Sequence, residues 1–316
     1  MKEEISYISE IKRLKEEKNA IILAHYYQTG DIQDIADVVG DSLALAQKAA
    51  ANDADIILFA GVKFMAETAK ILSPDKKVLL PDMAAGCSLS DSCNPVDFKK
   101  FIEDNPGRTV IAYVNTSAEI KALSDIICTS SNAVKIVESL PEKEKIIFAP
   151  DRNLGNYIIN QTGRDMLVWN GTCHVHEEFS LEAIIKLKEQ YPDAKIIVHP
   201  ECELPVRLVA DYIGSTSSLL SFIKNDSSKT YIVATEVGII HQMTKSHPEK
   251  KYIPVPPRDS TCACSECNFM KLITVKKIYE CLMKEAPEIL LDQDIISKAV
   301  IPIRRMLEIS EKAGPG

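Results

Sequence analysis

Three segments of the sequence resemble one another and recur at nearly equal spacing. Each begins with an apolar stretch that stops at a polar residue, and each continues with an acid followed five residues later by a hydroxyl residue. The acids Asp37, Asp125 and Asp211 lie 88 and 86 residues apart. Because self-similarity at a fixed period indicates a repeated structural unit, the pattern predicts three units of roughly 90 residues each.

Short stretches rich in β-branched and apolar residues alternate with helical patterns, which predicts parallel α/β layers formed three times over. The expected strands are 20–24, 56–60, 77–81, 109–114, 146–150, 166–169, 195–199, 231–235 and 251–255. The expected helices between them are 42–50, 132–140 and 181–191. We expect domains over 20–105, 106–192 and 193–297, closed by a charged amphipathic helix over 1–19, which does not resemble a signal peptide, and by a helix over 298–312.

The cysteines follow the same spacing as the repeated segments. Cys87, Cys173 and Cys267 lie 86 and 94 residues apart, one in each predicted unit. Three thiolates around one axis suit an iron–sulfur cluster in which one iron has no protein ligand. The chain has nine cysteines, an odd number, which favours metal binding or catalysis over a disulfide scaffold.

A second interpretation of the cysteines is local. Cys262, Cys264 and Cys267 form a C-x-C-x-x-C motif, which could hold zinc or a cluster within one loop. This interpretation leaves the spacing of Cys87 and Cys173 unexplained.

The hydroxyl residues of the repeat, Ser42, Ser130 and Thr216, also have two interpretations. Each is expected where a loop becomes a helix, and Ser and Thr often do no more there than cap the helix. Alternatively, three such helix ends surround one pocket that attracts phosphates and carboxylates. The residues that follow the strands should face the same pocket and include imidazoles, phenols and a carboxylate, which is a general acid/base set. They are His25, Tyr27, Tyr113, Asn115, His199 and Glu201.

Composition and missing motifs exclude several classes of function. A formal net charge of −8 and a pI near 5.4 argue against a nucleic-acid partner. No run of 18 apolar residues occurs, so no membrane span is expected. The sequence has no G-x-G-x-x-G after a strand, no P-loop motif and no G-x-S-x-G, which disfavours nicotinamide dehydrogenases, P-loop NTPases and α/β-hydrolases.

The motifs of the chain resemble those of the quinolinate synthase family, iron–sulfur enzymes of NAD biosynthesis. The resemblance runs from about Ile21 to Leu307, nearly the whole chain. It rests on the joint order of the motifs ILAHYYQ, DIADVVGDSLALA, GVKFMAE, PDMAAGCS, YVNTSAEIKALSDIICTSSNAV, PDRNLG, NGTCHVHEEF, VHPEC, ADYIGST and TEVGIIH.

The resemblance implies a triangular protein of three homologous three-layer α/β/α domains with parallel sheets around a pseudo-threefold axis. It also implies a 4Fe-4S cluster held by Cys87, Cys173 and Cys267. The implied reaction condenses iminoaspartate (iminosuccinate) with dihydroxyacetone phosphate to give quinolinate, phosphate and water. A cytoplasmic location is expected, as is transient contact with an aspartate oxidase or dehydrogenase that hands over the unstable iminoaspartate.

The resemblance also assigns roles to individual residues. Glu201 is the expected proton shuttle, Tyr27 assists the triose phosphate chemistry, and Tyr113 and His199 complete the catalytic set. The expected substrate contacts are His25, Ser42, Tyr113, Val114, Asn115, Ser130, His199, Pro200, Glu201 and Thr216.

The chain departs from the simplest family pattern at the third cysteine, where it carries three cysteines instead of one. Cys267 is the expected ligand because the residues after it, NFM, match the family's context. Cys262 or Cys264 could take its place, or the two could form a redox disulfide. Two other classes of function stay open: an iron–sulfur redox carrier or sensor without a substrate, and a zinc-stabilised binding scaffold.

Overall fold

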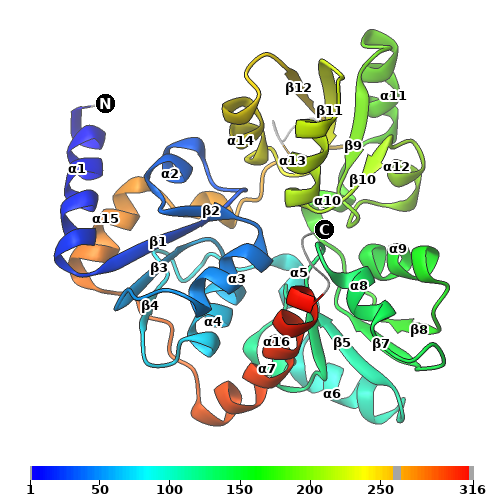
Figure 1. The fold of residues 1–316 in the computed structure, drawn as a ribbon, viewed down its shortest axis with the longest axis horizontal. Coiled ribbons are helices and arrows are strands. Elements are labelled where there is room, and N and C mark those ends of the chain that lie inside the picture. Colours follow the sequence, from blue (N-terminus) through cyan, green and yellow to red (C-terminus); the bar gives the residue numbers. More distant parts are fainter. Residues whose placement is uncertain (1, 259–264, 313–316) are drawn as a thin grey trace.

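Three four-stranded sheets, arranged as a triangle, form the framework of the molecule (Figure 1). The computed structural model describes residues 2–258 and 265–312, with side chains from residue 7 onward. Neighbouring strands pair in parallel in every sheet. The strand order is the same three times: the first strand of each unit lies between the second and the third, and the fourth lies at the far edge. The predicted fold class, three homologous α/β/α domains around a pseudo-threefold axis, is confirmed.

The strands are short, and most of their residues are buried. The first sheet contains β1 (Ala20–His25), β2 (Val38–Gly40), β3 (Ile56–Ala60) and β4 (Lys77–Leu79). The second contains β5 (Thr109–Tyr113), β6 (Ile126–Cys128), β7 (Ile146–Ala149) and β8 (Met166–Val168). The third contains β9 (Lys195–Val198), β10 (Tyr212–Ile213), β11 (Thr230–Ala234) and β12 (Lys251–Pro254).

The sequence predicts nine of these strands within two residues of their observed ends. It misses β2, β6 and β10, the edge strand that follows the repeated acid in each unit. These strands have two or three residues and stop directly at Asp41, Thr129 and Gly214, whereas the equally short β4 and β8 are followed by apolar residues that lengthen the strand pattern.

The repeated acid attaches each edge strand to its neighbour. The carboxylates of Asp37, Asp125 and Asp211 accept a hydrogen bond from a backbone N–H of the first strand of their own sheet, at 2.8, 2.8 and 2.7 Å. The backbone N–H of each acid donates to the carbonyl of that same strand residue, at 3.0, 2.9 and 2.8 Å. The acid is therefore conserved between the units of this chain for a structural reason.

Helices cover both faces of the sheets and connect successive strands. The helices within the first unit are α2 (Gly30–Ile35), α3 (Ser42–Ala50) and α4 (Lys63–Leu72), and those within the second are α7 (Ala118–Ala122), α8 (Ala133–Glu138) and α9 (Arg152–Thr162). Helices α5 (Ser88–Asp91) and α6 (Pro95–Glu103) connect the first sheet to the second. Helices α10 (His174–Glu177) and α11 (Leu181–Gln190) connect the second sheet to the third, whose strands are joined by α12 (Leu204–Leu208), α13 (Thr216–Asn225) and α14 (Ile239–Ser246). The three predicted helices are confirmed as α3, α8 and α11.

The remaining helices join the units. Helix α1 (Lys2–Glu17) packs against β1 and against α15 (Val275–Lys284), which follows the short 3-10 helix η1 (Met270–Leu272). Helix α16 (Gln293–Lys312) packs against α4 of the first unit and against α7, α8 and β6 of the second. The predicted terminal helices are therefore present, and α16 begins five residues earlier than expected.

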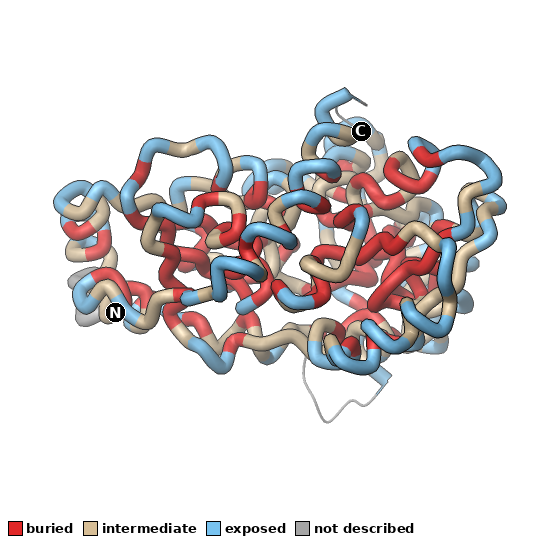
Figure 2. The backbone as a smooth tube through the Cα atoms, turned by 90° about the horizontal axis from the view of Figure 1, so that it is seen from below, coloured by how far each residue is buried: buried red, intermediate tan, exposed pale blue. Residues whose placement is uncertain are grey.

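The third sheet shows why each unit has three layers. Ile196 and Val198 of β9 belong to the apolar cluster on one face, whereas Ile197 between them belongs to the cluster on the other face. Both faces of the strand are buried, as expected for a parallel sheet between helices. Figure 2 shows the same pattern, with buried residues inside and exposed residues on the outer loops and helices.

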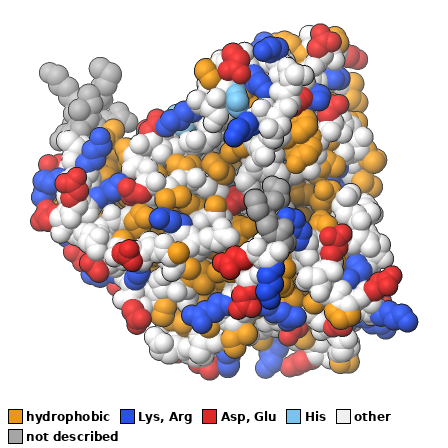
Figure 3. All heavy atoms as spheres, in the orientation of Figure 1, with side chains coloured by type: hydrophobic (Ala, Val, Ile, Leu, Met, Phe, Trp, Pro, Cys, Tyr) orange, Lys and Arg blue, Asp and Glu red, His pale blue; other side chains and the backbone are white. Residues whose placement is uncertain are grey.

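The surface carries charges of both signs. Lys and Arg are interspersed with Asp and Glu on the face shown in Figure 3. Within the described residues, no helix combines the length and apolar character needed to cross a bilayer.

Candidate active site and metal centre

A cavity lies where the three units meet, at the carboxyl ends of the strands. It contains about 700 Å³ of space not occupied by protein atoms, its open mouth included. Such edges of α/β sheets are common ligand sites. The sequence-predicted residues that line it are His25, Tyr27, Ser42, Cys87, Tyr113, Asn115, Ser130, Cys173, His199, Glu201, Thr216 and Cys267.

Two expected substrate contacts do not line this cavity. Val114 is buried in the core and faces a small adjoining cavity that it shares with Ser42 and Met65. Pro200 is buried between His199 and Glu201.

The repeated hydroxyls are not the helix caps. Asp41 caps α3, since its carboxylate accepts from Ala44 N at 2.9 Å, and Ser215 caps α13. Ser42 and Thr216 are instead the first helical residues, and Ser130 lies two positions before Asn132, the N-cap residue of α8. The interpretation that these hydroxyls only cap helices is therefore wrong, and all three face the cavity.

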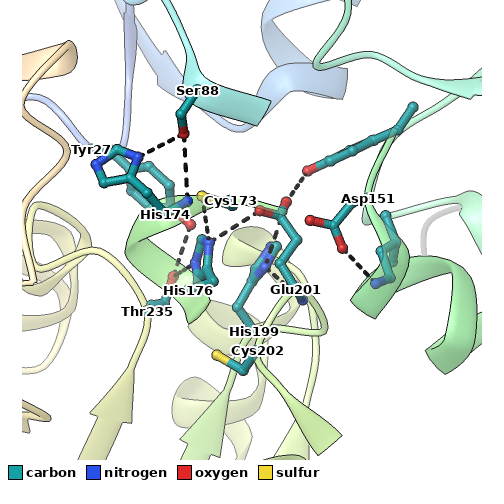
Figure 4. Close-up of polar contacts among 12 residues, drawn as sticks. Tyr27, Ser88, Asp151, Cys173, His174, His176, His199, Glu201, Cys202 and Thr235 are labelled. Atoms are coloured by element: carbon teal, nitrogen blue, oxygen red, sulfur yellow. Dashed lines mark hydrogen bonds and ion pairs between the residues drawn. The ribbon is translucent and has the colours of Figure 1, made fainter. Parts of the chain in front are cut away.

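Glu201 lies at the centre of a hydrogen-bonded network (Figure 4). Its Oε1 accepts from the hydroxyl of Tyr113 at 2.5 Å, and its Oε2 lies 3.1 Å from Nδ1 of His176. The other ring nitrogen of His176 lies 3.0 Å from the hydroxyl of Thr235, which is 2.8 Å from that of Tyr27. The network thus connects residues of all three units.

The surroundings of Glu201 keep it ionised. Burial alone would raise its pKa, but His176, His199 and the hydrogen bond from Tyr113 outweigh burial and lower the pKa to about 2. Burial lowers the pKa of His199 to about 3, although Glu201 opposes this shift. At neutral pH the cavity therefore combines a carboxylate that can accept a proton with a neutral imidazole.

The phenols and His25 complete this set. Burial, reinforced by Glu201, raises the pKa values of Tyr27 and Tyr113 well above the usual range, so both remain protonated donors. Burial lowers the pKa of His25 to about 4, so that imidazole is neutral at pH 7.

The three expected metal ligands differ from the other cysteines. Among the cysteines that the structure describes, only Cys87, Cys173 and Cys267 are partly exposed; the rest are buried. All three line the cavity; Cys267 raises the pKa of Cys87, and Cys87 and Cys267 both raise the pKa of Cys173. Burial is the main reason that the pKa of each is raised, and it takes that of Cys87 to about 12.

The donor set fits a cluster with three thiolate ligands. Backbone N–H groups of Leu89 and Ser90 point to the sulfur of Cys87, and those of Phe269 and Met270 to the sulfur of Cys267. Such N–H groups stabilise ligating thiolates and tune clusters. Cys262 and Cys264 lie outside the described residues, so the local C-x-C-x-x-C alternative stays a prediction.

The sequence did not point to several cavity residues. His176 and Glu236 line it, and Lys271 reaches Glu236 Oε1 at 2.8 Å. Glu236 comes directly after β11 and Thr235, so the strand-end rule applied to every strand would have found it. His176 lies three residues after Cys173 and has no counterpart in the other units, so the repeat could not reveal it.

Comparison with known sequences gives the family. A sequence model of the family described as quinolinate synthetase A protein matches residues 9–308. The chain belongs to this family.

Several relatives are similar over nearly their whole length. The quinolinate synthase of Microcystis aeruginosa is 62% identical over 300 residues, which cover 95% of this chain and 94% of the relative. The quinolinate synthase of a Synechococcus strain is 58% identical over 95% of this chain and 94% of the relative. That of Chloroherpeton thalassium is 54% identical over 98% of this chain and 96% of the relative.

Proposed function

We propose that the chain is a quinolinate synthase of NAD biosynthesis. It would condense iminoaspartate with dihydroxyacetone phosphate and release quinolinate, phosphate and two water molecules, which balances the atoms. The relatives bear this name. The observation that supports it most is that one cavity combines three partly exposed thiols with an ionised carboxylate, neutral imidazoles and protonated phenols.

The substrates are negatively charged, and the cavity contains groups that bind anions. Ser42 and Thr216 occupy the first turns of α3 and α13, where backbone N–H groups and the helix dipole favour phosphates and carboxylates. His25 and Asn115 add neutral polar groups at the strand ends. We assign the dicarboxylate and phosphate contacts to these residues and to Ser130, which also lines the cavity.

Cys87, Cys173 and Cys267 would hold a 4Fe-4S cluster. When bound, the cluster supplies a Lewis acid that assists the loss of water. Because burial keeps the free thiols protonated, loading must release their protons.

The protein's own groups move the protons. Glu201 is ionised and accepts a proton from substrate carbon, while Tyr113 donates to its Oε1 and holds it in place. Tyr27 remains protonated and reaches Glu201 only through Thr235 and His176, so it is placed to donate to the triose phosphate. His199 is neutral, and its ring stacks on that of His176 with 4.5 Å between centroids.

An anaerobic assay tests the proposal. Reconstituted protein given iminoaspartate and dihydroxyacetone phosphate should form quinolinate, and Cys87→Ala, Cys173→Ala and Cys267→Ala should each lose most iron. Cys93→Ala is the matched control because Cys93 is buried outside the cavity. A full cluster with no quinolinate formed, and with cluster spectra that a dicarboxylate does not change, would favour the redox carrier.

A further inference from the structure

Three different metal-binding side chains converge on one wall of the cavity. The donor atoms of Cys173, His176 and Glu201 all lie within 4.8 Å of one another. The thiol sulfur of Cys173 is 3.3 Å from Nδ1 of His176, which is 3.1 Å from Oε2 of Glu201. Thiolate, imidazole and carboxylate are the ligands that zinc uses in proteins.

The spacing of these atoms is close to that of a tetrahedral zinc site. Zinc bonds of about 2.3 Å to sulfur and about 2.0–2.2 Å to nitrogen and oxygen place neighbouring ligand atoms roughly 3.3 to 3.6 Å apart. The two distances from Nδ1 of His176, 3.3 Å to sulfur and 3.1 Å to oxygen, need to grow by only a few tenths of an ångström, and the third pair, Cys173 and Glu201, lies within 4.8 Å. Such a change is within the reach of side-chain torsions.

The ligands are also held from behind. Nε2 of His176 lies 3.0 Å from the hydroxyl of Thr235, so Nδ1 is directed toward Cys173 and Glu201. Oε1 of Glu201 accepts from Tyr113 at 2.5 Å, which leaves Oε2 for a metal. Outer contacts of this kind orient the ligands of real zinc sites.

We propose that Cys173, His176 and Glu201 form a zinc site in the chain before it receives a cluster. Zinc binding displaces the thiol proton of Cys173 to solvent, and the two negative ligands balance the charge of the ion in this buried place. The fourth position faces the cavity, as in zinc sites that keep a water ligand.

The site has a consequence for loading, and this part rests on the proposed function. Cys173 is also a proposed cluster ligand, so zinc and the cluster cannot be bound together. Zinc therefore blocks cluster assembly and leaves a chain that already holds its cluster unaffected.

Cobalt(II) and zinc titrations of the cluster-free chain test the site. The chain should carry Cys262→Ser and Cys264→Ser, which remove the other zinc-type motif. We expect one ion per chain and a visible cobalt spectrum typical of tetrahedral thiolate ligation. His176→Gln and Cys173→Ser should weaken binding by roughly 100-fold or more.

Matched controls separate this site from the three-cysteine set. His174→Gln and Cys267→Ser change residues of the same types that line the same cavity but are not in the proposed ligand set. Both should keep the affinity of the parent chain. Loss of binding in Cys267→Ser with normal binding in His176→Gln would overturn the proposal, as would the absence of stoichiometric binding. Circular dichroism confirms that each variant folds.

Cluster reconstitution in the presence of zinc tests the exclusion. Added zinc should prevent iron incorporation into the parent chain and should do so far less in His176→Gln. Equal incorporation with and without zinc would refute the exclusion. Failure of the proposed enzyme activity would show itself differently, as a loaded cluster without quinolinate, and would leave the zinc titrations unchanged.

Discussion

The charge on Glu201 depends on a few neighbouring atoms. Tyr113 and His176 each contact one of its carboxylate oxygens, and together with His199 they overcome the effect of burial. A carboxylate held in this way is ionised over the whole range in which the protein would work. Its function as a base can therefore be tested by a change that keeps its shape.

Glu201→Gln should keep the fold and the bound iron but reduce turnover by about 10² to 10⁴, the usual effect of losing a general base. The amide can still contact Tyr113 but cannot accept a proton from carbon. Steady-state rates and iron content measured on the same sample check this expectation. If the variant turned over within a few-fold of the parent protein, the base would be Tyr27, Tyr113 or His199 instead.

His25 should make the stability of the cluster-free chain depend on pH. Burial lowers its pKa to about 4, whereas the unfolded chain binds this proton at a pKa near 6.5. Because the folded pKa is depressed, the stabilisation is fully present above pH 6.5 and is lost as the pH falls toward 4, by up to about 1.4 kcal/mol per pH unit.

His25→Gln removes this contribution. Urea unfolding at pH 7 and pH 5 should show a smaller loss of the free energy of unfolding for the variant than for the parent chain. Parallel losses in the two proteins would contradict the expectation.

At the scale of elements, the repeated acid and its edge strand form one structural feature that occurs in each of the three units. The acid exchanges two hydrogen bonds with the first strand of its sheet, and the edge strand follows directly. Each edge strand ends near a hydroxyl of the cavity, so this feature also sets the position of Ser42, Ser130 and Thr216.

Replacing the acid should therefore lower the free energy of unfolding by a similar amount in different units. Asp125→Ala and Asp211→Ala each leave a backbone N–H of the first strand without its carboxylate partner, and each should lower the free energy of unfolding by about 1–3 kcal/mol. Asp193→Ala is the control, since Asp193 is exposed in a loop. If only one of the two variants had a lower free energy of unfolding, the acids would not be equivalent.

The sequence predicted the elements that have a strong pattern and missed those that depend on a single contact. Central strands such as β3 and β7 are apolar on both sides and were predicted correctly. The edge strands β2, β6 and β10 follow an acid that bonds to the neighbouring strand, and their short apolar runs, which end at a polar residue or a glycine, did not show a strand pattern. The domain boundaries stay a prediction.

The candidate site divides in the same way. Residues repeated in all three units, such as Ser42 and Thr216, were found because the repeat marks them. His176, which lines the cavity, and Lys271, which pairs with the lining residue Glu236, each occur once and are placed there only by tertiary packing, which no spacing rule describes.

At the scale of the whole molecule, Lys271 connects separate units. Its Nζ lies 2.8 Å from Oε1 of the buried Glu236 and 2.6 Å from the carbonyl oxygen of Tyr27. The same carboxylate oxygen accepts from the backbone N–H of Cys267 at 3.1 Å. One ion pair thus ties the third expected cysteine ligand to the first unit.

Lys271→Met should lower the free energy of unfolding by about 3–5 kcal/mol, because it leaves the buried carboxylate of Glu236 without an opposite charge. The double change Lys271→Met with Glu236→Gln should recover much of this loss. Lys245→Met is the matched control, since Lys245 also bridges the first and third units, through Asp34, but at the surface. Equal losses for Lys271→Met and Lys245→Met in denaturant unfolding would contradict the argument.

The position of α16 affects the order in which the chain is completed during synthesis. Residues 293–312 pack against α7 and β6, which leave the ribosome far earlier. At a synthesis rate of about 5–20 residues per second, the apolar surface beneath α16 would stay exposed for on the order of ten to thirty seconds before α16 is made. During that interval the nascent second unit would offer a binding surface to chaperones, and the arrival of its last helix would end the exposure.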